Sequence, residues 1–106
     1  MQEISATEAA ALLTNEPGDV ILLDVREVVE LQMAAVDGAL HIPMAEIPAR
    51  LNELDKNKTI VCMCHSGGRS AHVAAFLLDQ GFARVINLAG GIDGWSADVD
   101  DSIPRY

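Results

Sequence analysis

Positively charged residues are scarce in this sequence of 106 residues. Lysine and arginine together number 7, against 16 aspartates and glutamates, which gives a formal net charge of −9. Nucleic acids and anionic membrane surfaces attract basic proteins, so this balance argues against both as partners. The first interpretation of the charge is a solvated acidic surface, and a basic protein partner is the second.

Long apolar runs are also absent. No stretch approaches the length of a membrane-spanning helix, and residues 1–4 lack the basic and apolar regions of a signal peptide. Cysteine occurs only at positions 62 and 64. These features predict a cytoplasmic protein whose two thiols stay free, because a reducing compartment disfavours structural disulfides. The histidines and cysteines show none of the paired spacings of a zinc site, so no metal is expected.

Half of the residues are hydrophobic, which is enough for the core of one small domain, and we take residues 1–106 as that domain. Apolar runs predict strands at 20–25, 39–42, 59–63 and 84–88. Helices are predicted at 5–13, 27–35, 45–54, 69–80 and 92–97, and residues 98–106 are interpreted as a polar tail. Strands that alternate with helices indicate an α/β fold, with a mostly parallel central sheet flanked by helices on both faces.

The most informative segment is residues 64–70, Cys-His-Ser-Gly-Gly-Arg-Ser. It joins the predicted strand 59–63 to the predicted helix 69–80, so Cys64 lies at the carboxyl end of a strand. Backbone N–H groups of such a loop can converge on the sulfur, and the helix N-terminus adds positive potential. These donors would lower the pKa of Cys64 and make it a candidate nucleophile. The alternative interpretation is an inert buried thiol.

The rest of this loop is the candidate substrate-binding segment, which comprises His65, Ser66, Gly67, Gly68, Arg69 and Ser70. Gly67 and Gly68 are predicted to adopt positive φ angles that aim N–H groups at the sulfur. Arg69 has two compatible interpretations: it binds the anionic end of a substrate, or it holds the loop closed through a carboxylate. His65 is the nearest candidate acid or base, although histidines in exposed loops commonly take no part in the chemistry.

A second candidate segment ends the predicted strand 20–25. Asp24 lies at the carboxyl end of that strand, and sites form outside the carboxyl ends of parallel strands, so one cleft with Cys64 is expected. Asp24 and Arg26 are predicted to form ion pairs that fix the site wall. A catalytic role for Asp24 is the second interpretation, because a carboxylate beside Cys64 would oppose thiolate formation. Cys62 points to the same face as Cys64 and is interpreted as a core residue, with a redox partner of Cys64 as the alternative.

Taken together, the motifs resemble those of single-domain members of the rhodanese family of sulfurtransferases. The segments that carry the resemblance follow in family order and spacing over nearly the whole chain: Leu23–Glu27 with Glu30, Gly38–Pro43, Cys64–Ser70, Gly81–Phe82, Val85–Leu88 and Gly90–Trp95. The Cys-x4-Arg spacing of the loop is shorter than the Cys-x5-Arg loop of related phosphatases and arsenate reductases. A shorter loop fits a single sulfur atom on the cysteine rather than a phosphate group.

The resemblance implies a small rhodanese-like domain that transfers sulfur through a persulfide on Cys64. A donor such as thiosulfate would load the cysteine, and cyanide, a thiol or a partner protein would take the sulfur. No metal or organic cofactor is implied, because the cysteine itself carries the sulfur. Three alternatives stay open: a persulfide carrier that turns over poorly, a binding module without activity, and, less favoured, a phosphatase or arsenate reductase.

Overall fold

The computed structural model describes residues 1–106 and contains a five-stranded sheet in which all neighbours are parallel. Its strands, in spatial order, are β1 (Gln2–Ile4), β5 (Arg84–Leu88), β4 (Thr59–Met63), β2 (Val20–Asp24) and β3 (Leu40–His41). The α-helices are α1 (Ala6–Asn15), α2 (Val28–Leu31), α3 (Gly68–Asp79) and α4 (Gly91–Asp98), and two 3-10 helices are η1 (Met44–Glu46) and η2 (Pro48–Glu53). The predicted α/β fold with a parallel sheet is confirmed.

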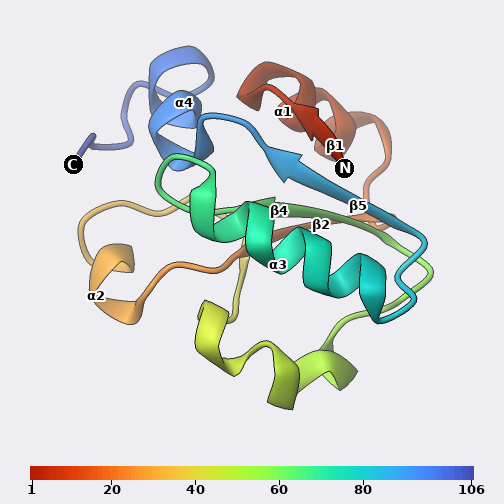
Figure 1. The fold of residues 1–106 in the computed structure, drawn as a ribbon. Helices are drawn as coiled ribbons and strands as arrows, with labels where there is room; N and C mark the ends of the chain where they lie inside the picture. Colours follow the sequence, from red (N-terminus) through yellow and green to blue (C-terminus); the bar gives the residue numbers. More distant parts are fainter.

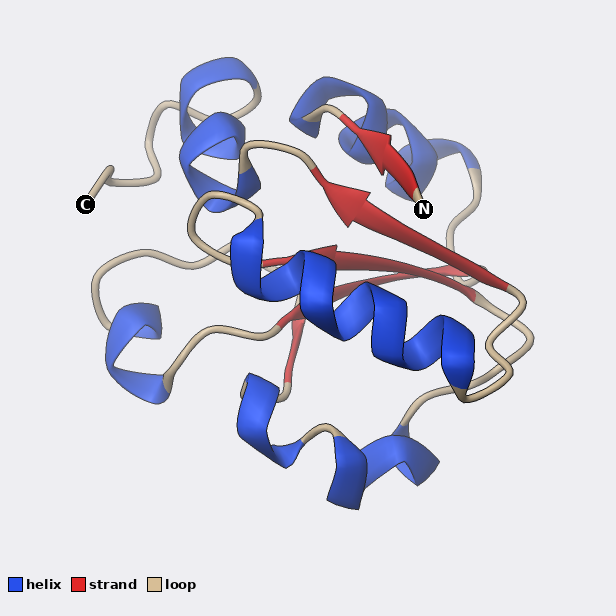
Figure 2. Cartoon of the chain, viewed as in Figure 1, coloured by secondary structure: helices blue, strands red, loops and turns tan.

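Helices cover both faces of the sheet (Figure 1), and Figure 2 shows the strands between the two helical layers. The central strand β4 explains the arrangement, because its residues alternate between two hydrophobic cores. Val61 and Met63 belong to the core shared with α1 and α4, whereas Ile60 and Cys62 belong to the core shared with α3. Every residue of β4 is buried, as expected for a parallel strand that is covered on both faces.

Two helices differ from the prediction. The helix predicted at 27–35 is confined to α2, which buries none of its residues and so lacks an apolar face to hold further turns. The helix predicted at 45–54 is replaced by η1 and η2, because Pro48 has no N–H to continue a helical ladder. The longest helix, α3, has 12 residues, and none of the helices is long and apolar enough to cross a lipid bilayer.

The two ends of the chain also differ from the prediction. Residues 2–4 form the edge strand β1 beside β5. The sequence predicts no strand there, because Ile4 is the only one of the three residues that is buried and no apolar run marks the segment. The predicted polar tail folds back on α4: Ile103 is buried, its carbonyl accepts a hydrogen bond from the Ser96 hydroxyl, and Arg105 pairs with Asp93 at 2.9 Å. This packing carries the last residues to the carboxyl edge of the sheet.

Candidate active site

The candidate site lies where β2 and β4 end side by side. The register of these strands pairs Asp24 with Met63, so the residue that follows, Cys64, lies beside the carboxyl end of β2. The chain then leaves β2 toward β3 and leaves β4 toward β5, on opposite sides. Connections that diverge in this way open a crevice at the carboxyl edge of a parallel sheet. The expected neighbourhood of the two strand ends is therefore present.

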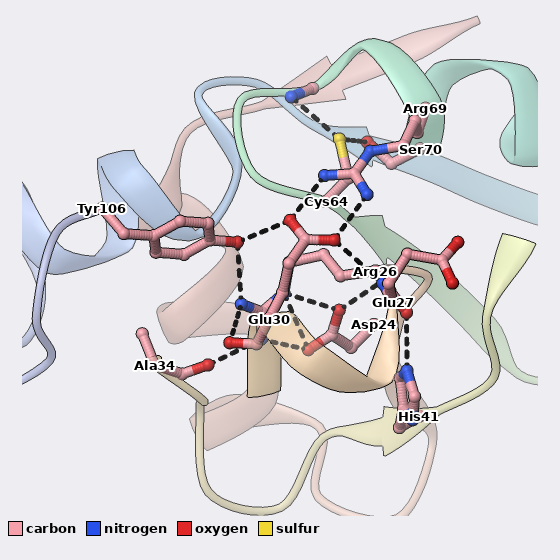
Figure 3. Close-up of polar contacts among 11 residues, drawn as sticks. Asp24, Arg26, Glu27, Glu30, Ala34, His41, Cys64, Arg69, Ser70 and Tyr106 are labelled. Carbon is pink, nitrogen blue, oxygen red and sulfur yellow. Dashed lines mark hydrogen bonds and ion pairs between the residues drawn. The ribbon is translucent and has the colours of Figure 1, made fainter. Parts of the chain in front are cut away.

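Hydrogen-bond donors of the following loop enclose the sulfur of Cys64 (Figure 3). The backbone N–H of Gly67 donates to Sγ at 3.1 Å, and the Ser70 hydroxyl oxygen lies 3.4 Å from Sγ. Burial by itself would raise the pKa of this thiol, but the Ser70 hydroxyl and the N–H groups of Ser70, Gly67 and Ser66 outweigh it. The pKa of Cys64 is therefore lowered from its ordinary value. The N-terminus of α3 adds positive potential at the same point.

Only one of the two loop glycines has a positive φ angle. Gly67 has φ +119° and is the N-cap of α3, whereas Gly68 is the first helical residue. The predicted positive φ is thus correct for Gly67 and wrong for Gly68, because a single left-handed residue is enough to turn the chain from the strand into the helix.

Helix α4 fixes the other side of the loop. The N–H of Ile92 donates to the Cys64 carbonyl at 2.9 Å, and the N–H of Asp93 donates to the His65 carbonyl at 3.1 Å. Gly91, at φ +56°, lies so close to the Cys64 and His65 carbonyls that a β-carbon there would overlap both of them. A glycine is therefore required at this position.

A chain of polar contacts leads from the sulfur to the edge of the sheet. The Ser70 hydroxyl lies 2.6 Å from Asn87 Oδ1, and Asn87 Nδ2 donates to Glu3 Oε2 at 2.8 Å and to the Gly67 carbonyl at 3.1 Å. Ser70 and Asn87 are both buried. Neither Asn87 nor Glu3 is among the predicted site residues, although a polar residue inside the apolar run Val85–Leu88 is a signal that could have identified Asn87.

Asp24 and Arg26 form a buried ion pair at the wall of the site, with 2.7 Å between Arg26 Nη2 and Asp24 Oδ2. Arg26 also donates to the Ala34 carbonyl and to the Tyr106 hydroxyl, each at 2.9 Å. Burial opposes the charge of Arg26, but the bonds to Asp24 and Tyr106 outweigh it and raise the pKa of the guanidinium. Both side chains are thus turned to each other and to their supports, and the predicted ion pair is present.

The guanidinium of Arg69 is held by a carboxylate. Arg69 Nη1 and Nη2 donate to the two oxygens of Glu30 at 2.7 and 2.8 Å, a bidentate contact across 39 positions of sequence. Arg69 is the main cause that lowers the pKa of Glu30 to about 2, and Glu30 in turn raises the pKa of Arg69. Of the two interpretations of Arg69, the structure contains the carboxylate-bound one. In the sequence, Glu30 stands out only as part of the motif that begins at Leu23.

Tyr106 reaches the site from the C-terminal segment. Its ring stacks on the imidazole of His65, with centroids 4.1 Å apart and an interplanar angle of 9°. Its hydroxyl donates to Glu30 Oε1 at 2.9 Å and accepts from Arg26 Nη1 at 2.9 Å. His65 therefore faces Tyr106, and the tyrosine joins the two arginine–carboxylate pairs. Nothing in the local sequence pattern indicates this role for Tyr106.

Cys62 lies in the core of the sheet with no exposed surface, and burial raises its pKa to about 12. Its interpretation as a core residue is confirmed, and both cysteines are free thiols. The structure brings together no three His, Cys, Asp or Glu side chains that could hold a metal ion.

Comparisons with known proteins agree with this arrangement. Residues 5–98 match the family described as the rhodanese-like domain. A sulfurtransferase of Allochromatium vinosum is 42% identical over 78 residues, which cover 74% of this chain and 73% of that protein. The thiosulfate sulfurtransferase GlpE of Glaesserella parasuis is 32% identical and covers 88% of this chain and 84% of its own length. The crystal structure of a rhodanese-like domain protein from Staphylococcus aureus is 32% identical, with a TM-score of 0.84 over 100% of this chain and 99% of that one.

Proposed function

Because the chain belongs to the rhodanese family, we propose that it is a sulfurtransferase that carries sulfane sulfur as a persulfide on Cys64. The donor is thiosulfate or a related sulfane compound, and the acceptor is cyanide in the test tube and a thiol or a partner protein in the cell. The observation that carries the proposal is the set of donors that enclose the sulfur and lower the pKa of Cys64.

The chemistry follows from a stabilised thiolate. Cys64 Sγ attacks the outer sulfur of thiosulfate, the sulfur–sulfur bond of the donor breaks, and its electron pair leaves with sulfite. The persulfide anion that forms is stabilised by the N–H groups of the loop as the thiolate was. An acceptor nucleophile then attacks the outer sulfur and restores the Cys64 thiolate. No metal or organic cofactor is needed in this route, since the cysteine carries the sulfur.

In this proposal, the loop residues 65–70 surround the donor, and Asp24 with Arg26 supports the wall without taking part in bond changes. Residues 1–106 act as one domain, because the two hydrophobic cores share one sheet. We place the protein in the cytoplasm, where a reducing environment keeps both cysteines free for the reaction cycle.

A persulfide carrier is the second candidate function. Two observations favour it: Cys64 is only 1% exposed, and Arg69 is paired with Glu30 rather than free to bind an anion. A carrier would load at Cys64 and deliver sulfur to a partner, but would turn over slowly with thiosulfate and cyanide.

The test of the proposed function is thiocyanate formation from thiosulfate and cyanide. We expect turnover by the wild type and by Cys62→Ser, no turnover by Cys64→Ser, and parallel lines in double-reciprocal plots, because the enzyme alternates between free and persulfide forms. Slow turnover with complete loading of Cys64 would select the carrier. Equal turnover by Cys64→Ser, or hydrolysis of an aryl phosphate that depends on Cys64, would contradict the proposal.

A further inference from the structure

We propose that Glu30 is a specificity-determining residue that disfavours dianionic sulfur donors such as thiosulfate and favours the outer sulfur of a hydropersulfide, R–S–SH. The inference deepens the proposed function and rests on it, since it concerns which donor loads Cys64.

The basic side chains around Cys64 are all matched by carboxylates. Arg69 pairs with Glu30 at 2.7 Å and Arg26 pairs with Asp24 at 2.7 Å. Arg105 pairs at 2.9 Å with Asp93, whose N–H holds the His65 carbonyl. No uncompensated side-chain cation is left to receive a dianion at this edge of the sheet, in a protein whose net charge is −9.

The Arg69–Glu30 pair is more exposed to solvent than the sulfur beside it. Cys64 itself is 1% exposed, whereas the Arg69 and Glu30 side chains are 33% and 14% exposed. Figure 3 shows the guanidinium between the Cys64 sulfur and the Glu30 carboxylate, and the charges of Cys64 and Arg69 influence each other. The Glu30 carboxylate therefore repels an anionic donor near Sγ and offsets the attraction that Arg69 would exert on it.

Tyr106 keeps this carboxylate in place. Its hydroxyl donates to Glu30 Oε1 at 2.9 Å, the same oxygen that accepts from Arg69 at 2.8 Å. The Tyr106 ring is itself fixed by its stack on His65. The Glu27 N–H donates to the other oxygen, Oε2, at 2.9 Å. Two donors besides Arg69 thus hold Glu30 in place, which hinders any exchange of the carboxylate for the sulfonate end of thiosulfate.

A hydropersulfide makes a smaller demand on the site. The Cys64 thiolate attacks the outer sulfur of R–S–SH, the sulfur–sulfur bond breaks, and the electron pair leaves with R–S⁻, while the proton stays on the transferred sulfur. The donor R–S–SH brings no charge of its own, and the single negative charge of the Cys64 thiolate leaves on R–S⁻. With thiosulfate, the donor brings two additional charges past Glu30, and the repulsion rises in proportion.

The experiment measures the rate of Cys64 loading by intact-protein mass spectrometry with two donors, thiosulfate and the hydropersulfide of 2-mercaptoethanol. In Glu30→Gln, we expect the thiosulfate rate constant to rise about tenfold and the hydropersulfide rate constant to change less than about twofold, the size expected for one partly screened charge. Glu27→Gln is the matched control, because it removes an exposed charge at the N-cap of α2 that is not paired with Arg69 and keeps the backbone N–H that donates to Glu30. Its ratio of the two rate constants should equal that of the wild type.

Tyr106→Phe gives a second arm that keeps the ring stack and removes only the hydroxyl. We expect the ratio of rate constants to shift toward thiosulfate, by less than in Glu30→Gln. If Glu30→Gln does not fold, the ratio of the two loading rate constants in Tyr106→Phe tests the inference in its place. Loading by both donors with a ratio that neither variant changes would overturn the inference and leave the proposed function intact, whereas a wild type that neither donor loads would overturn the proposed function.

Discussion

The hydroxyl oxygen of Ser70 lies 3.4 Å from the sulfur of Cys64, at the start of α3. The same oxygen lies 2.6 Å from Asn87 Oδ1, which can only accept hydrogen bonds. A hydroxyl has one proton to donate, so the two acceptors compete for it. The protonation state of Cys64 is thereby coupled to the polar chain that runs to Glu3.

Replacement of Ser70 by alanine should raise the pKa of Cys64, because the hydroxyl is the strongest of the groups that lower it. The ultraviolet absorbance of the thiolate, followed as a function of pH, measures this shift. Ser70→Thr retains a hydroxyl and serves as the control, with a pKa close to that of the wild type. An unchanged pKa in Ser70→Ala would show that the backbone N–H groups suffice.

The two cysteines should differ sharply toward an alkylating reagent. Cys64 has a lowered pKa, whereas burial raises that of Cys62 to about 12. Iodoacetamide at neutral pH should therefore modify one residue of the folded protein and both residues in denaturant. Peptide mapping by mass spectrometry identifies the site, and preferential modification of Cys62 in the folded state would contradict this assignment.

The Glu30–Arg69 pair should make folding stability depend on acid. The pKa of Glu30 is lowered in the folded state from 4.5 to about 2, mainly by Arg69. A lowered pKa contributes stability that is complete above about pH 5 and is lost as the pH falls toward 2. We expect a loss of about 1 kcal/mol over this window, since Arg69 is a third exposed and solvent screens the pair. Urea unfolding at several pH values measures it.

Glu30→Gln is the control for this pH dependence. The variant should lose less free energy of unfolding between pH 5 and pH 2 than the wild type, because an amide has no proton to gain. Identical pH profiles for the two proteins would show that other carboxylates account for the acid sensitivity.

A methyl group at Gly91 should displace the active-site loop. The β-carbon of Gly91→Ala would overlap the carbonyls of Cys64 and His65, and the residue has φ +56°. We expect a loss of about 2 kcal/mol or more in the free energy of unfolding, together with a higher pKa of Cys64, because the N–H groups no longer point at the sulfur. Chemical denaturation and thiolate absorbance report the two effects.

Gly94→Ala is the matched control for Gly91→Ala in the same helix. A β-carbon at Gly94 would meet only the Ala89 carbonyl, at an ordinary 3.8 Å. The variant should stay within about 1 kcal/mol of the wild type or be more stable, because alanine favours helix. Equal destabilisation by both variants would show that the overlap of a Gly91 β-carbon with the loop carbonyls is not the cause of the loss in free energy of unfolding.

The central strands and the Cys64 loop could be predicted because their signals are local. Val20–Asp24 and Thr59–Met63 are apolar runs of strand length, and burial on both faces of the sheet is what produces such runs. The loop follows one strand directly and opens the longest helix, so its placement needed no tertiary information.

The contacts that complete the site could not be predicted from local patterns. Glu30 meets Arg69 over 39 positions of sequence and Tyr106 over 76, and no periodicity connects such residues. The strand β1 cannot be predicted for a related reason: its three residues owe their conformation to the pairing with β5 rather than to an apolar run. Tyr106 lies in a segment whose polar composition conceals the burial of Ile103.

Intact-protein mass spectrometry before and after exposure to thiosulfate or a hydropersulfide decides whether Cys64 carries the transferred sulfur. We expect a gain of one sulfur atom in the wild type and in Cys62→Ser, reversal of the gain by cyanide, and no gain in Cys64→Ser. A sulfur atom that appears in Cys64→Ser, or a wild type that gains none from either donor, would contradict this role of Cys64.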